Sequence, residues 1–226
     1  MAEKCVIIYL IMLNRDYKNF GPGEYSHVYN RGNEKKDIFL DDDDYSFFLY
    51  RLEQNLFPDR THKHRTAPLP AGSFTLISYC LMPNHFHLLI RQNSDIPVTK
   101  LILRVCTSYS MYFNKKYGRV GHLFQDRYKL ASVDTNDYLL WLTAYIHQNP
   151  KVGGLVEVLS DYKWSSYSEY ISGNNFLCDD KIILSQFERS QLNSSKPVDY
   201  KKFVDSSYEI IKQRKDIHDL LLDHIS

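Results

Sequence analysis

The order of strand-like and helix-like hydrophobic patterns along the chain limits its fold more than any other feature. Residues 25–31 alternate in polarity and residues 74–81 form an apolar run of β type, whereas residues 45–56 repeat apolar side chains at steps of three and four. The first two patterns indicate strands, and the third indicates an amphipathic helix. The chain therefore interleaves strands and helices.

Turn-forming and helix-capping residues define where these elements end. Acidic residues 41–44 precede the first helix, where carboxylates complement the helix dipole, and Pro58 closes it. A surface loop is expected over residues 60–72. The turn at residues 82–84 joins the second strand to a returning strand over residues 85–91, so the two form a hairpin.

A second helix, a last strand and a third helix follow the hairpin. Pro97 occupies a favourable first-turn position of the second helix, and residues 123–133 have the pattern of a strand. Polar residues 134–137 then supply capping side chains for the third helix. That helix should end near Asn149, because Pro150 disfavours helical geometry in the residue before it.

This order predicts an α+β fold with a ferredoxin-like βαββαβ core, an antiparallel sheet with helices on one face, and a further helix after the last core strand. We expect an N-terminal extension over residues 1–24, a core domain over residues 25–170 and a helical C-terminal extension over residues 171–226. Two separate helices are expected in that extension, at residues 200–212 and 216–225.

Cysteine use and apolar content restrict the cellular compartment. A chain of 226 residues with 43% hydrophobic side chains can build one substantial core. Its four cysteines lie far apart without a CxxC pair, which disfavours a disulfide framework and favours the reducing cytoplasm. The apolar run at residues 5–13 is too short to span a bilayer; it is either a short strand or an extension upstream of a start at Met12.

Positive charges gather in one part of the chain, although the net charge is only +1. Between residues 98 and 130, seven basic residues stand against one acid, Asp126, and aromatic side chains lie between them. Single-stranded bases stack on such rings and phosphates bind basic side chains, so the segment is a candidate for nucleic-acid binding, with a solvated helix face as the alternative. Residues 60–65 form a second basic cluster.

Two histidines and one helix carry the candidates for catalysis. His85 and His87 are two apart on a predicted strand, so their side chains leave the same face and can hold one ion. Tyr145 and Asn149 are four apart on the third helix and share one of its faces. On spacing alone, packing of Tyr145 and capping of the helix end by Asn149 is the simpler explanation.

Four sequence strings, in this order, resemble the REP-associated tyrosine transposases, which are relatives of the insertion-sequence 200-like transposases in the HUH nuclease superfamily. They are YNRGN at residues 29–33, LMPNHFHLL at 81–89, GHLFQDR at 121–127 and YIHQNP at 145–150. The resemblance covers residues 25–170, and the string at 81–89 is its most specific part.

The resemblance implies that His85, His87 and Asn149 hold a divalent ion and that Tyr145 is the nucleophile. Two imidazoles and an amide leave coordination positions open for DNA oxygens, which suits Mg²⁺ or Mn²⁺. The implied reaction cleaves and rejoins single-stranded DNA at hairpin-forming repeats through a 5′-phosphotyrosine intermediate. A cytoplasmic monomer with its tyrosine acting in cis is favoured, with a homodimer as the alternative and no membrane partner.

Other polar residues have supporting roles at most. Phosphate contacts are expected from Arg31, Lys115, Lys116, Arg119, Arg127 and Lys129. Strand packing explains Tyr25, Tyr29 and His27 better than catalysis does, and His147 lies on a different helix face from Tyr145.

Two other functions remain as alternatives. A structure-specific DNA-binding protein without strand transfer would keep this fold, but the intact set of Tyr145, His85, His87 and Asn149 argues against loss of chemistry. A zinc hydrolase with a water nucleophile would remain active without Tyr145, yet the sequence near the histidines offers no convincing acidic base.

Overall fold

Four strands form one antiparallel sheet at the centre of the molecule. The computed structural model describes residues 20–60, 67–187 and 196–223, so the apolar run at residues 5–13 and most of the basic cluster at residues 60–65 lie outside the described residues. The strands are β1 (Tyr25–Arg31), β2 (Phe74–Met82), β3 (His85–Gln92) and β4 (Lys129–Val133), and their order across the sheet is β2-β3-β1-β4. With α2 (Asp42–Leu56) between β1 and β2 and α3 (Val98–Lys116) between β3 and β4, the predicted ferredoxin-like core is confirmed.

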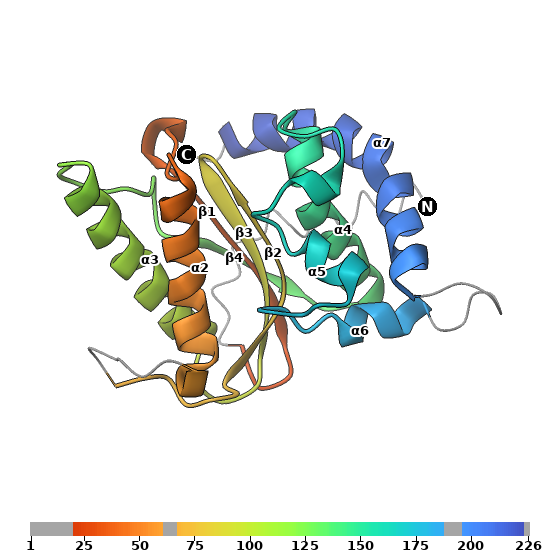
Figure 1. Cartoon of the computed structure of the whole chain (residues 1–226), viewed down its shortest axis with the longest axis horizontal. Helices are drawn as coiled ribbons and strands as arrows, with labels where there is room; N and C mark the ends of the chain where they lie inside the picture. The colour runs from red at the N-terminus through yellow and green to blue at the C-terminus, as the bar shows by residue number, and fades with distance from the viewer. Residues whose placement is uncertain (1–19, 61–66, 188–195, 224–226) are drawn as a thin grey trace.

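Helices cover both faces of this sheet, which makes the molecule three layers thick (Figure 1). On one face lie α2 and α3, and Phe48 of α2 packs against Phe86 of β3 with ring centroids 5.1 Å apart. On the other face lies α4 (Asn136–Val152), with α5 (Tyr167–Ser172), α6 (Lys181–Leu184) and α7 (Lys196–Asp223) beyond it. Short 3₁₀ helices span Asn33–Lys35, Pro58–Arg60, Leu159–Asp161 and Ser185–Phe187.

Side-chain caps begin two of the helices at the residues that the sequence predicted. Asp41 accepts a hydrogen bond from the Asp44 backbone N–H at 3.2 Å and so begins α2. Thr135 caps α4 in the same way through the Tyr138 N–H, also at 3.2 Å. The chain between β1 and α2 turns beside the β2–β3 hairpin, where the Ile38 N–H donates to the Pro83 carbonyl at 2.8 Å.

The expected end of α4 at Asn149 is wrong. The helix continues through Pro150 to Val152, because one further turn is closed by the Gly153 N–H, which donates to the Asn149 carbonyl at 2.8 Å. Proline removes only its own N–H from the helix, and in the last turn that loss affects a single hydrogen bond. The sequence rule for the residue before proline therefore gave a boundary three residues too early.

Two other boundaries also differ from expectation. β4 begins at Lys129 instead of residue 123, because its pairing with β1 stops at Tyr29 and, beyond that pair, the bridge between Gly32 and Phe124 is isolated. The two expected C-terminal helices form the single helix α7. No glycine or proline lies between residues 212 and 216 to interrupt it.

The C-terminal helix α7 packs against α4 and is hydrogen-bonded to it. Gln148 Nε2 donates to the Val204 carbonyl at 2.7 Å, and the hydroxyl of Tyr200 lies 2.6 Å from His147 Nδ1. Both contacts are buried. The predicted extension over residues 171–226 thus supports the helix that carries Tyr145, while the division into domains stays a prediction.

Candidate functional site

Strand pairing places both histidines of the HxH pair on the sheet face that α4 covers. Tyr29 of β1 lies opposite His87 of β3, and Arg31 lies opposite His85. Because side chains alternate between the two faces, these four residues point to the same side. The ring of Tyr145, from α4, lies against His87 on that side.

The two histidine rings are neighbours, and each is held by another residue. Their centroids lie 5.1 Å apart at an interplanar angle of 88°. Nδ1 of His85 lies 2.6 Å from Asn84 Oδ1, and Nδ1 of His87 lies 2.9 Å from Nε2 of His27. His87 is buried and His85 is half-buried, so the pair runs from the interior toward the molecular surface.

The ring of Tyr145 lies close to His87 and His27 of its own chain. Its ring centroid lies 5.5 Å from that of His87 and 6.5 Å from that of His27, with the rings nearly perpendicular in both cases. The side chain is half-buried, between α4 and the sheet. The Tyr145 ring and the HxH pair, from segments far apart in the sequence, are thereby brought to the same side of the sheet.

Asn149 lies one turn beyond Tyr145 on α4 and is buried. Its Nδ2 donates to the Tyr145 carbonyl at 2.9 Å, which makes Oδ1 the atom that could ligate a metal. Two imidazoles and an amide oxygen are ligands that divalent ions accept. In the described part of the chain, no three His, Cys, Asp or Glu side chains form a group that could hold a metal, so a site here would depend on an amide or on the substrate.

Two residues that the sequence analysis assigned to strand packing lie in this site. The Tyr29 ring lies beside both His27 and His87, with ring centroids 4.9 Å and 5.8 Å away. His27 is fully buried and contacts His87 directly. The alternation of β1 puts residues 27 and 29 on one face, but only the register with β3 reveals which face that is.

Two of the six basic residues predicted to contact DNA, Arg31 and Lys129, lie on the histidine side of the sheet, and Arg127 lies two residues before Lys129. Arg31 ends β1, and its Nε donates to Gln125 Oε1 at 3.2 Å. Lys129 begins β4, with its ammonium 5.9 Å from the centre of the Tyr29 ring. Arg127 is exposed just before it. These side chains could bind phosphates of a DNA strand that reaches Tyr145.

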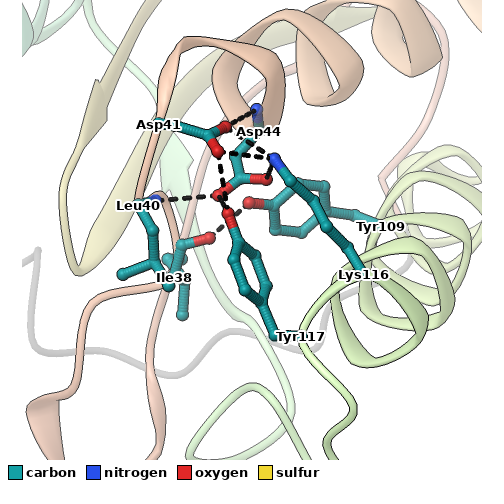
Figure 2. Close-up of polar contacts among 7 residues, drawn as sticks. All are labelled: Ile38, Leu40, Asp41, Asp44, Tyr109, Lys116 and Tyr117. Atoms are coloured by element: carbon teal, nitrogen blue, oxygen red, sulfur yellow. Dashed lines mark hydrogen bonds and ion pairs between the residues drawn. The ribbon is translucent and has the colours of Figure 1, made fainter.

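The other three basic residues, Lys115, Lys116 and Arg119, belong to the end of α3 and the turn after it, and α3 covers the opposite face of the sheet. Lys116 forms ion pairs with Asp41 at 2.6 Å and Asp44 at 2.8 Å (Figure 2). Two carboxylates thus offset its charge. These ion pairs give Lys116 a structural role, and a phosphate contact from it stays a prediction.

Around Lys116, four residues form what we call the α2–α3 cluster: Asp41, Asp44, Lys116 and Tyr117. The Tyr117 hydroxyl donates to Asp44 at 2.8 Å, and Asp44 also accepts the Leu40 N–H at 2.8 Å. The hydrogen bond from Lys116 holds the pKa of Asp41 below its ordinary value. The cluster joins the start of α2 to the end of α3.

His147 lies away from the site, as its helix position predicted. It is fully buried on the α7 side of α4, where Tyr200 lies at Nδ1 and Ser166 Oγ lies 2.8 Å from Nε2. Burial lowers the pKa of His147 to about 3, so the ring is neutral at physiological pH. A group with so low a pKa is a weak base, and both ring nitrogens face away from Tyr145, so His147 is not the base that activates Tyr145.

Comparison with known proteins supports the resemblance inferred from the sequence. Residues 59–149 match the family described as Transposase IS200 like. A solved structure described as the REP associates tyrosine transposase bound to a REP hairpin is similar in fold, with a TM-score of 0.53 and 14% sequence identity. The similarity covers 74% of this chain and 90% of the other. No curated protein matches in sequence.

The family match confirms the resemblance to the IS200-like transposases over residues 59–149. The structural similarity confirms the shared α+β fold. Within the described ranges, the structure contains no helix that is both long and apolar enough to span a membrane.

Proposed function

We propose that this chain, which is similar to the IS200-like transposases, is a metal-dependent single-tyrosine transposase that cuts and rejoins single-stranded DNA at hairpin-forming repeats. The observation that carries the proposal is the position of Tyr145, whose ring centroid lies 5.5 Å from that of His87 beside the HxH pair. The similar solved structure is of a transposase bound to a REP hairpin, which supports a DNA hairpin as the substrate.

His85 and His87 would hold the divalent ion, with Asn149 Oδ1 as a third ligand. Two neighbouring imidazoles on one sheet face and an amide whose Nδ2 is already engaged fit such an ion. Mg²⁺ or Mn²⁺ suits this neutral set, because much of the coordination would come from DNA oxygens. When bound, the ion would offset the negative charge that develops on the phosphate during attack.

Tyr145 would supply the nucleophile. Its phenolic oxygen would form a bond to phosphorus as the bond from phosphorus to the 3′ oxygen breaks, which leaves a 5′-phosphotyrosine and a free 3′-hydroxyl. The phosphotyrosine retains the energy of the phosphodiester, so attack by a 3′-hydroxyl rejoins DNA without ATP. A phenol has a pKa of about 10, so the proton must be removed as attack occurs. α4 contributes by holding Tyr145 against the histidines.

Basic side chains would guide the DNA strand to this tyrosine. Arg31 and Lys129 flank the histidine face at the ends of β1 and β4, and Arg127 lies close in sequence to Lys129. Lys115 and Arg119 remain candidates for contacts farther from the reacting phosphate. Phosphate contacts of this kind position a strand without reading its sequence.

A search for a covalent adduct tests the proposal. Purified protein is incubated with labelled single-stranded hairpin oligonucleotides, with and without Mn²⁺, and separated under denaturing conditions. We expect a metal-dependent protein–DNA adduct that is absent from Tyr145→Phe. Tyr29→Phe is the matched control, because it removes a hydroxyl from the same site and should leave the adduct in place.

Other outcomes would favour the alternatives. Hairpin binding without an adduct from any oligonucleotide would indicate a DNA-binding protein that has lost strand transfer. Cleavage that persists in Tyr145→Phe would indicate a water nucleophile. An adduct lost in Tyr29→Phe and kept in Tyr145→Phe would move the nucleophile to β1.

A further inference from the structure

Both histidines of the HxH pair use the same ring nitrogen to bind a neighbouring residue. Nδ1 of His85 lies 2.6 Å from Asn84 Oδ1, and Nδ1 of His87 lies 2.9 Å from His27 Nε2. A metal would therefore have to be bound through Nε2 of each ring. Whether Nε2 carries a lone pair or a proton depends on the tautomer that these two neighbours impose.

Asn84 determines the tautomer of His85. The amide orientation is fixed independently, because Asn84 Nδ2 donates to the Lys35 carbonyl at 3.2 Å. The oxygen Oδ1 must then face His85, and an amide oxygen can only accept a hydrogen bond. His85 Nδ1 is consequently protonated, which leaves Nε2 of the neutral ring with its lone pair.

The bond between His27 and His87 can form in two ways. Either His87 donates from Nδ1 and its Nε2 keeps a lone pair, or His27 donates from Nε2 and His87 carries its proton on Nε2. Only the first arrangement permits His87 to bind a metal through Nε2. His27 is 0% exposed and His87 is 3% exposed, so the bond is shielded from water and its direction can be maintained.

We propose that Asn84 and His27 are positioning residues that fix the tautomers of His85 and His87, so that both Nε2 atoms present lone pairs to the metal. The inference rests on the proposed metal-binding role of the two histidines. It assigns His27 the Nδ1-protonated form, with Nε2 as an acceptor. His27 would act through His87 and would not touch the ion or the DNA.

Metal titration of His27 variants tests this arrangement without relying on catalysis. His27→Gln keeps a side-chain oxygen that can accept from His87, whereas His27→Phe fills the space without an acceptor. We expect His27→Phe to weaken Mn²⁺ binding about 10- to 100-fold, as is usual when the partner of a ligating histidine is lost, and His27→Gln to restore most of it. The exposed His122→Gln is the control for removing a histidine.

The tautomers can be measured directly by two-bond ¹H–¹⁵N correlation spectra of the ¹⁵N-histidine-labelled, Mg²⁺-saturated protein. We expect protons on Nδ1 of His27, His85 and His87, and Asn84→Leu should change the pattern of His85. Equal unfolding midpoints in urea for His27→Phe and His27→Gln would exclude a folding defect as the cause of their different affinities.

Three results would overturn the inference. The first is unchanged Mn²⁺ affinity in His27→Phe. The second is a proton on His27 Nε2 in the Mg²⁺-saturated protein. In either case a wild-type protein that still forms the metal-dependent adduct would leave the proposed function intact. The third result, no metal binding and no adduct by the wild-type protein, would reject the proposed function and this inference with it.

Discussion

His147 and Tyr145 lie two residues apart on α4 but face different parts of the molecule. Tyr145 points toward the sheet, whereas His147 points toward α7 and has Tyr200 and Ser166 at its two ring nitrogens. Protonation would place a charge in the interior and would force Nδ1, the atom beside the Tyr200 hydroxyl, to become a donor. His147 thus stabilises the fold only while it is neutral.

The stability of the protein should therefore fall as the pH falls below about 6.5. The pKa of His147 is about 3 in the folded protein, below the ordinary value near 6.5 in the unfolded chain. Between these values the unfolded state binds more protons, so the contribution of His147 is complete above about pH 6.5 and declines by up to about 1.4 kcal/mol per pH unit below it. Urea unfolding between about pH 4 and pH 8 measures this slope.

The matched variants for this measurement are His147→Gln and His122→Gln. The first replaces the buried ring with an amide that can still donate to Ser166 and accept from Tyr200, so its stability should depend less on pH. The second alters an exposed histidine and should follow the wild-type curve. Parallel curves for wild type and His147→Gln would mean that another group causes the acid sensitivity.

At the scale of elements, the α2–α3 cluster fixes two helices that share one face of the sheet. The Asp44 side chain is 0% exposed and accepts hydrogen bonds from Leu40, Lys116 and Tyr117. The neighbouring Asp42, in contrast, pairs with Lys163 at the surface, where both side chains are more than half exposed. The same kind of ion pair is thus present in a buried and an exposed setting.

Asp44→Asn should destabilise the protein by about 2–3 kcal/mol, because one donor among Leu40, Lys116 and Tyr117 would then face an amide NH₂ in a buried position. Asp42→Asn should cost at most about 1 kcal/mol, because its pair is exposed to water. Urea unfolding of both variants at neutral pH measures the difference. Equal losses of unfolding free energy in the two variants would show that burial of Asp44 adds nothing to the strength of the α2–α3 cluster.

Much of the fold could be predicted because its elements are defined by local patterns. The βαββαβ order followed from strand and helix periods, and the caps of α2 and α4 followed from polar residues before each helix. Pro150 gave too early an end for α4, since the sequence does not reveal that a further turn closes after it. The single helix α7 was missed because a weak amphipathic pattern gives poor boundaries.

The sequence predicted which residues form the candidate site, but not which residues surround them. The spacing of His85 and His87 predicted that they share one face of a strand, and the spacing of Tyr145 and Asn149 predicted that they share one face of a helix. Neither spacing predicts that the strand face and the helix face lie against each other. His27 was assigned to packing because its contact with His87 depends on the register of β1 against β3, and that register is a property of the assembled sheet. The ion pairs of Lys116 could not be predicted, because its two acidic partners lie more than seventy residues earlier.

At the scale of the whole molecule, the layer order places Tyr145 beside histidines of its own chain. The histidines come from the sheet and Tyr145 comes from α4, which lies directly on that sheet and is held from behind by α7 through the bond from Gln148 to Val204. A tyrosine that served a partner chain would have to leave this position. The arrangement therefore favours a site completed within one chain.

Mixing two inactive variants tests this arrangement. One variant is Tyr145→Phe, and the other is the double substitution His85→Ala and His87→Ala, so that neither chain alone has both parts of the site. If the site is completed in cis, the mixture should form no adduct with a hairpin oligonucleotide. A dimer with exchanged tyrosines would recover an adduct, and the linked chain would be the one that lacks the histidines.

A size tag on one variant identifies the linked chain on a denaturing gel. Mixtures of wild type with Tyr145→Phe provide the control, because cis chemistry predicts an adduct yield that falls in proportion to the wild-type fraction. An adduct on the histidine-deficient chain would require α4 to move away from its own sheet, at the cost of the buried contact between His147 and Ser166, whose Oγ also accepts the Tyr79 N–H of β2. Loosening that contact by Ser166→Ala should then increase the exchanged product, whereas in a cis enzyme it should leave the mixture inactive.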